Sequence, residues 1–115
     1  MLFKIAAVAL VFFGECLEIT GELLASKRAA NPDHIATFAQ TFLLMVVGGA
    51  LLIAGYMLGY LHLRNIWIIV AVSLATLAVG EPLLAFLLFQ ESPTTGALIG
   101  LVLGILGILS AFLIP

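Results

Sequence analysis

Charged residues are scarce in this chain. Four Lys or Arg and six Asp or Glu make up 9% of its 115 residues, whereas soluble domains average about a quarter. A water-soluble fold of this length could not bury the 64% of residues that are hydrophobic. The net charge of −2 is too small to indicate nucleic acid as a partner. The composition therefore predicts an integral membrane protein, with the lipid bilayer as its surroundings.

The sequence also has few residues that could carry chemistry. Cys16 is the single cysteine, which excludes an intrachain disulfide, and no group of residues has the spacing of a metal site. The chain contains no nucleophile–base pair and no phosphate-binding loop. We therefore expect no enzymatic activity, no cofactor and no metal.

Long apolar runs make up most of the chain instead. Four of them are long enough to cross about 30 Å of hydrocarbon, at residues 2–25, 36–60, 66–89 and 95–114. The links after the second and third runs are so short that they must join antiparallel neighbours. The first run starts like a signal peptide, but its apolar pattern continues past Glu18, and we expect a spanning helix. The expected fold class is all-α, a single four-helix membrane bundle over residues 1–115.

The basic residues are divided evenly between the two ends of such a bundle. One end would carry Lys4 and Arg64, and the other Lys27 and Arg28. The positive-inside rule therefore has no bias on which to act. Either other signals set one orientation, or copies insert both ways and pair antiparallel, and the sequence leaves both possibilities open.

Three glutamates interrupt the first apolar run. Glu15, Glu18 and Glu22 are spaced i, i+3 and i+7, so their carboxyl groups project from one helical face. Because a charge near the bilayer centre costs about 2.5–3.5 kcal/mol on insertion scales, such groups face a bundle interior or a watery cavity and often mark an ion or proton path. Glu22 lies near the membrane edge, whereas Glu15 and Glu18 are deeper and are candidate proton- or substrate-binding residues. The alternative is that they only form hydrogen bonds with a neighbouring helix.

A fourth acidic residue, Glu81, lies within the third run. Gly80 and Pro82 flank it, and Pro82 removes a backbone donor, so a helix kink is expected here. Transporters build midplane sites where a charged residue lies beside a kinked or broken helix. Glu81 is therefore the third candidate proton- or substrate-binding residue, with a plain kink as an equal alternative.

The fourth run carries no charge but has small residues at a regular spacing of four, four and three. These are Gly96, Gly100, Gly104 and Gly107. A helix face that is nearly free of side chains allows another helix to approach closely. We expect a dimerisation or packing helix, with the partner either in a second copy or in the same chain.

Together these segments resemble the small four-helix branch of the drug/metabolite transporter superfamily, which includes the small multidrug resistance family. The stretch "ECLEITGELL" is similar to its first-helix pattern, an acidic residue followed three positions later by Gly. This places the family's central glutamate at Glu18, with Glu15 as the competing register. The stretch "EPLLAFLLFQESPTTGALIG" is similar to a recurrent third-helix Pro, loop Glu and fourth-helix Gly. Here those positions are Pro82, Glu91 and Gly100.

The resemblance implies a small secondary transporter that works as a homodimer, antiparallel in some members, in a prokaryotic inner membrane. Glutamates of the two first helices would share one cavity and bind either protons or substrate, which gives proton-coupled exchange. The sequence departs from the family where "NIWIIVAVSLATL" replaces a stretch rich in Pro and small aromatic residues. A cationic compound, a metabolite and a lipid-linked compound are all candidate substrates. An accessory subunit of a larger membrane complex and a passive channel are the alternative functions.

Overall fold

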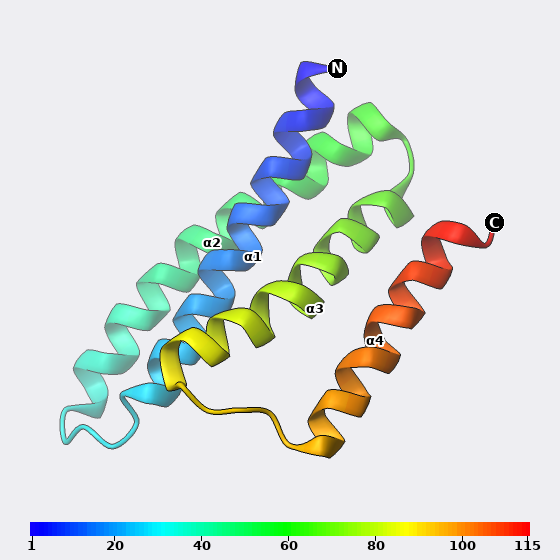
Figure 1. The fold of residues 1–115 in the computed structure, drawn as a ribbon. Helices are drawn as coiled ribbons and strands as arrows, with labels where there is room; N and C mark the ends of the chain where they lie inside the picture. The colour runs from blue at the N-terminus through cyan, green and yellow to red at the C-terminus, as the bar shows by residue number, and fades with distance from the viewer.

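The computed structural model describes all residues, 1–115, and consists of four α-helices (Figure 1). They are α1 (Leu2–Lys27), α2 (His34–Leu63), α3 (Ile66–Phe89) and α4 (Thr95–Leu113). The predicted all-α, four-helix architecture is confirmed. The predicted range of α3 is also the observed one. α1 extends two residues past its predicted run, through Ser26 and Lys27, α2 extends past its run at both ends, and α4 ends one residue earlier, at Leu113.

Polar caps set the ends of three helices. A side-chain oxygen accepts a hydrogen bond from a first-turn backbone N–H at the start of α2, α3 and α4, which satisfies a donor that has no partner within the helix. These caps are Asp33, Asn65 and Thr94. Arg64 and Gln90 end α2 and α3 in the left-handed conformation, with φ of 54° and 56°. The short links therefore reverse the chain direction.

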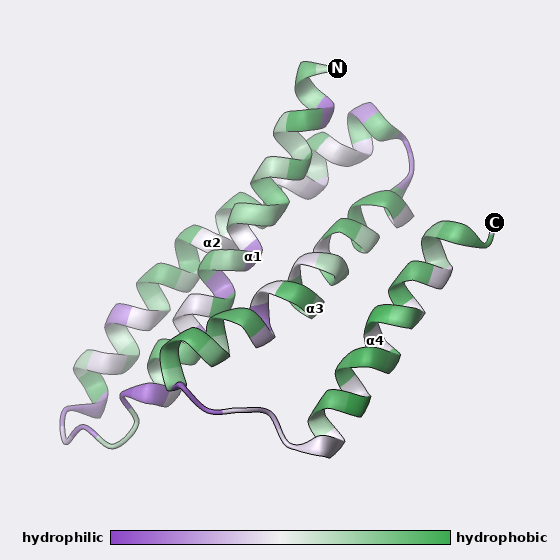
Figure 2. Cartoon of the chain, viewed as in Figure 1, coloured by the Kyte–Doolittle hydropathy of each residue, from purple (hydrophilic) through white to green (hydrophobic).

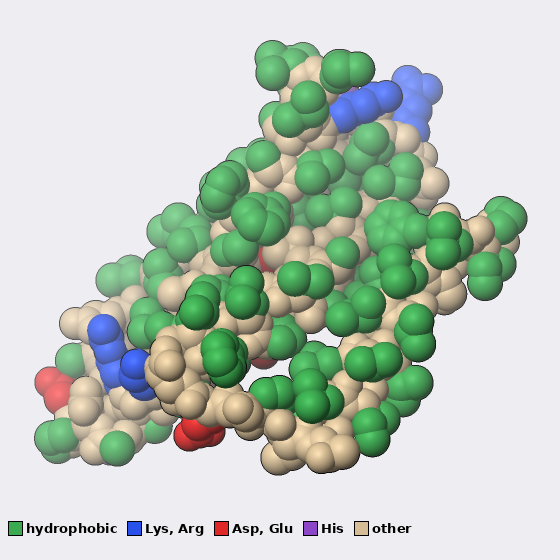
Figure 3. Space-filling view, in the orientation of Figure 1, with side chains coloured by type: hydrophobic (Ala, Val, Ile, Leu, Met, Phe, Trp, Pro, Cys, Tyr) green, Lys and Arg blue, Asp and Glu red, His purple; other side chains and the backbone are tan.

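Three of the helices, α2, α3 and α4, are long and apolar enough to cross a membrane, which indicates an integral membrane protein. The predicted span over residues 2–25 is not among them, because α1 is long enough but carries three glutamates and two lysines. Figure 2 shows hydrophobic residues along most of their length and hydrophilic ones gathered in the connections. Lys and Arg side chains lie at both ends of the bundle (Figure 3). The ring of Phe3 stacks on His62 at one end, with ring centroids 4.7 Å apart. At the other end, Lys27 Nζ donates to the carbonyl oxygen of Leu88 at 2.7 Å.

Glycines bring α1 and α2 into close contact. A Cβ on Gly14 would lie 2.8 Å from Leu52 Cγ and 2.9 Å from the carbonyl oxygen of Gly48. A Cβ on Gly55 would lie 2.7 Å from Val11 Cγ2. Larger residues at these positions would push the helices apart, so Gly14, Gly48 and Gly55 permit the close approach that small residues give membrane helices.

The helices are packed to very different extents. α1 packs against both α2 and α3, and the fully buried side chains Val11, Ile19 and Ile69 belong to this part of the bundle. α4 contacts α3 alone, and none of its residues is buried. Figure 1 shows α4 set apart from the α1–α2 pair, on the other side of α3. Within the chain, the core is therefore a three-helix core.

Candidate functional site

The three glutamates of α1 lie in three different surroundings. Glu15 is buried, with 7% of its surface exposed. Glu18, one turn further along, is partly exposed, and Glu22 is exposed near the end of the helix. The predicted placement of Glu22 near an end and of Glu15 and Glu18 deeper in the bundle agrees with this arrangement.

Glu15 is held by the neighbouring helix α3. Its Oε1 accepts a hydrogen bond from Ser73 Oγ, and Ser73 is itself 7% exposed. This is the one hydrogen bond between two side chains in the interior, because the other side-chain pair, Arg28 with Gln40, is exposed. Glu15 therefore has the arrangement of a carboxyl group bonded to a neighbouring helix, which the sequence left as an alternative.

Glu18 faces α2 and has a different neighbourhood. Its Oε1 lies 3.0 Å from the position that a Cβ on Gly48 would occupy, and 3.4 Å from that of a Cβ on Gly49. The two adjacent glycines thus form a recess for the carboxyl group. Glu18 takes part in none of the side-chain hydrogen bonds of the structure and is partly exposed, so its carboxyl group lacks the partner that Glu15 has.

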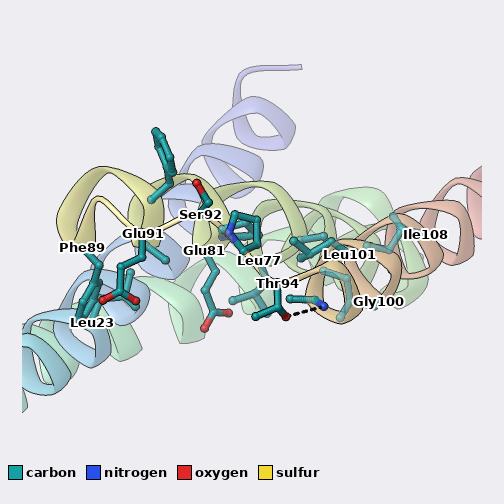
Figure 4. Close-up of a pocket in the computed structure, with 17 residues that line it drawn as sticks. Leu23, Leu77, Glu81, Phe89, Glu91, Ser92, Thr94, Gly100, Leu101 and Ile108 are labelled. Carbon is teal, nitrogen blue, oxygen red and sulfur yellow. Dashed lines mark hydrogen bonds between the residues drawn. The ribbon is translucent and has the colours of Figure 1, made fainter.

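Glu81 is not brought together with Glu15 and Glu18. It is exposed on α3 and lines a groove of about 860 Å³ between α3 and α4 (Figure 4). Gly80, its neighbour in sequence, faces α1, because a Cβ there would lie 3.6 Å from Ile19 Cδ1. Successive helix residues are about 100° apart, so Glu81 lies on a different face of α3 from Gly80; this face borders the groove, which Leu23 of α1 also lines. Pro82 lies within α3, which continues unbroken through Phe89.

The same groove collects the residues that carry the family resemblance in the second half of the chain. Pro82, Glu91 and Gly100 all line it, although they lie in α3, in the link and in α4. Thr94 also lines it, and its Oγ1 accepts the capping hydrogen bond drawn in Figure 4. The groove is walled mainly by apolar side chains.

The glycines of α4 contact no other helix in the chain. A Cβ on Gly96, Gly100, Gly104 or Gly107 would meet nothing within 4 Å. Gly104 and Gly107 line a second groove between α3 and α4, of about 580 Å³. The glycine face is thus open along the side of α4 that borders these grooves, and dimerisation through it stays a prediction.

Sequence reasoning missed two parts of this site. Ser73 is one of two hydroxyl residues in a long apolar run, and nothing in the sequence indicates that it, rather than Thr76, faces Glu15. Gly48 and Gly55 gave a clearer signal, because their spacing of seven matches that of Gly14 and Gly21 in α1. Such paired spacing predicts two glycine faces in contact.

The chain matches no protein-family model, no curated protein and no solved structure. No group of three or more His, Cys, Asp or Glu side chains is placed so that it could hold a metal ion. The candidate site therefore consists of carboxyl groups, a hydroxyl group and backbone.

Proposed function

We propose that the chain is a small secondary transporter that works as a homodimer, with Glu18 as the central carboxyl group. Protons and substrate would compete for Glu18, which couples the movement of one to the movement of the other. The substrate is a cationic compound, a metabolite or a lipid-linked compound. Alternating access would arise from rocking of one helix group against another around the fixed site.

The observation that carries the proposal is the contrast between Glu18 and its surroundings. A carboxyl group without a hydrogen bond, set in a helix among apolar residues, is expensive in a bilayer and typically marks an ion or substrate path. The recess at Gly48 and Gly49 leaves room around Glu18 Oε1 and lets it remain partly exposed. A structural carboxyl group would be expected to have a fixed partner, as Glu15 has.

The open face of α4 supports the dimer. An apolar helix with no buried residue and four unoccupied glycine positions can receive a helix of a second copy. The equal numbers of basic residues at the two ends permit either a parallel or an antiparallel pair.

An accessory subunit of a larger complex is the second candidate, and the same exposed α4 favours it, because a foreign helix could also cover this face. The mass of the purified protein in a mild detergent separates the two. A stable homodimer supports transport, whereas a stoichiometric foreign partner supports the accessory subunit.

Reconstituted Glu18→Gln protein tests the function itself. Proteoliposomes with a trapped pH-sensitive dye would receive members of each of the three substrate classes. Wild-type protein should produce a proton flux with at least one class, and Glu18→Gln should reduce it to that of empty liposomes. Glu22→Gln is the matched control, because Glu22 is exposed at the helix end and should be dispensable. Unchanged flux in Glu18→Gln would refute the assignment.

A further inference from the structure

Two buried hydroxyl residues of α3 use their hydrogen bonds differently. Thr76, 8% exposed, donates from Oγ1 to the carbonyl oxygen of Val72 in its own helix at 2.8 Å. Such back-bonding is the usual way for Ser and Thr to satisfy a hydroxyl group in an apolar helix. Ser73 instead donates to Oε1 of Glu15 on α1.

The Glu15–Ser73 contact lies in an interior with few other polar groups. Val11, Ile19 and Ile69 are the largest fully buried side chains of this core, and none of them can form a hydrogen bond. A buried carboxyl group that loses its partner bears the full cost of desolvation. Ser73 is therefore what makes the inward position of Glu15 favourable.

We propose that Ser73 is a positioning residue that holds Glu15 against α3 and so withholds it from exchange, leaving Glu18 as the exchanging carboxyl group of this pair in α1. That Glu15 is withheld from proton or substrate exchange rests on the proposed function, but the restraint of Glu15 by Ser73 does not. Glu15 and Glu18 lie one turn apart on the same face of α1, and the sequence offers either of them as the central glutamate. The neighbouring helices distinguish them, because α3 offers Glu15 a hydroxyl group and α2 offers Glu18 only a recess between glycines.

The test uses dicyclohexylcarbodiimide, which reacts with carboxyl groups in apolar surroundings, on the full-length protein in detergent. Peptide mass spectrometry then measures the label on each glutamate. In the wild type, Glu18 should be labelled and Glu15 protected. Ser73→Ala should raise the labelling of Glu15 about tenfold, the factor that corresponds to the loss of one hydrogen bond to a carboxyl group.

Two variants separate this role from a general loosening of the bundle. Thr76→Ala removes the neighbouring buried hydroxyl group and should leave Glu15 protected, whereas loosening would raise labelling in both alanine variants. Ser73→Thr keeps a hydroxyl group and should restore protection. If Ser73→Ala does not fold, Ser73→Cys has similar size and is a weaker donor, and it too must raise the labelling of Glu15.

Equal labelling of Glu15 and Glu18 in the wild type would overturn the proposal. So would a Glu15 that stays protected without the hydroxyl group of Ser73, or one that is exposed equally by Thr76→Ala. Because the labelling needs no substrate, it also separates the two claims. If labelling follows the expected pattern but Glu18→Gln still transports, the proposed function fails and the restraint by Ser73 stands.

Discussion

The first and last helices of this chain are opposites. α1 carries three glutamates, and six of its residues are buried between α2 and α3, Glu15 among them. α4 carries no charge, has no buried residue and contacts only α3. The helix that carries the acidic groups is thus the best packed, and the most apolar one is the least packed within the chain.

This difference indicates two separate tasks. Two of the acidic groups in α1 have specific surroundings, because Ser73 of α3 donates a hydrogen bond to Glu15 and glycines of α2 lie beside Glu18. α4 needs no such surroundings, because apolar side chains are stable against lipid. Its glycines are therefore free to serve contacts beyond this chain. Substitutions in α1 should affect the fold and the site, whereas those in α4 should affect assembly.

The largest effect on the fold should come from Gly14→Leu. A side chain there meets Leu52 Cγ and the backbone of Gly48 within 3 Å, and overpacking of this kind costs about 1–3 kcal/mol or more. We expect a clearly lower midpoint of thermal unfolding in detergent, followed by circular dichroism. A Gly14→Leu protein as stable as the wild type would mean that α1 and α2 do not meet at this position.

Gly104→Leu is the matching substitution in α4, where nothing lies within 4 Å of the added Cβ. We expect the free energy of unfolding of the chain to change by less than about 0.5 kcal/mol, while the proposed dimer dissociates. Native mass spectrometry at several protein concentrations measures the dimer. If Gly104→Leu leaves the dimer intact, the glycine face of α4 is not the contact between copies.

A smaller effect is expected when the recess of Glu18 is filled. Gly48→Ala places a methyl group 3.0 Å from Glu18 Oε1 and equally close to the backbone of Gly14, so it should lower the proton flux several-fold. Gly49→Ala places one at 3.4 Å with no other neighbour and should retain most of the flux. Equal flux in the two variants, at equal protein yield, would show that the recess does not position Glu18.

The smallest effect should come from Lys27→Met at the end of α1. This substitution removes the hydrogen bond to the carbonyl oxygen of Leu88, which ties α1 to the last turn of α3. Such bonds contribute about 0.5–1.5 kcal/mol, and this one is exposed, so we expect a loss near the lower value in chemical unfolding. A loss as large as that of Gly14→Leu would mean that the helix ends, rather than the glycine contact, hold α1 in place.

Most of the fold could be predicted from the sequence because each helix coincides with an apolar run. The range of α3 is correct since Asn65 and Gln90 mark both ends with polar residues. The end of α1 and the start of α2 were wrong by two residues because hydropathy does not detect helical turns that contain Ser26, Lys27 or His34. The end of α2 was placed three residues too early, at residue 60, although the helix continues to Leu63.

The candidate site was predictable only in part. The spacing of Glu15 and Glu18 shows that they share a face of α1, but which of them gains a partner depends on the rotation of α2 and α3, which the sequence does not specify. Glu81 illustrates the same limit. Its place beside Pro82 suggested a common pathway with the glutamates of α1. In the structure, Gly80 is the residue that faces α1, and Glu81, the next residue, lines the groove between α3 and α4.

The most direct test of the account is the release of protons when the purified protein binds the compound that drives flux in proteoliposomes. A pH indicator in weakly buffered detergent solution measures it. The account predicts that wild-type protein and Glu15→Gln release the same number of protons and that Glu18→Gln releases none. Proton release that survives in Glu18→Gln but disappears in Glu15→Gln would contradict it and would assign the exchange to the carboxyl group that Ser73 holds.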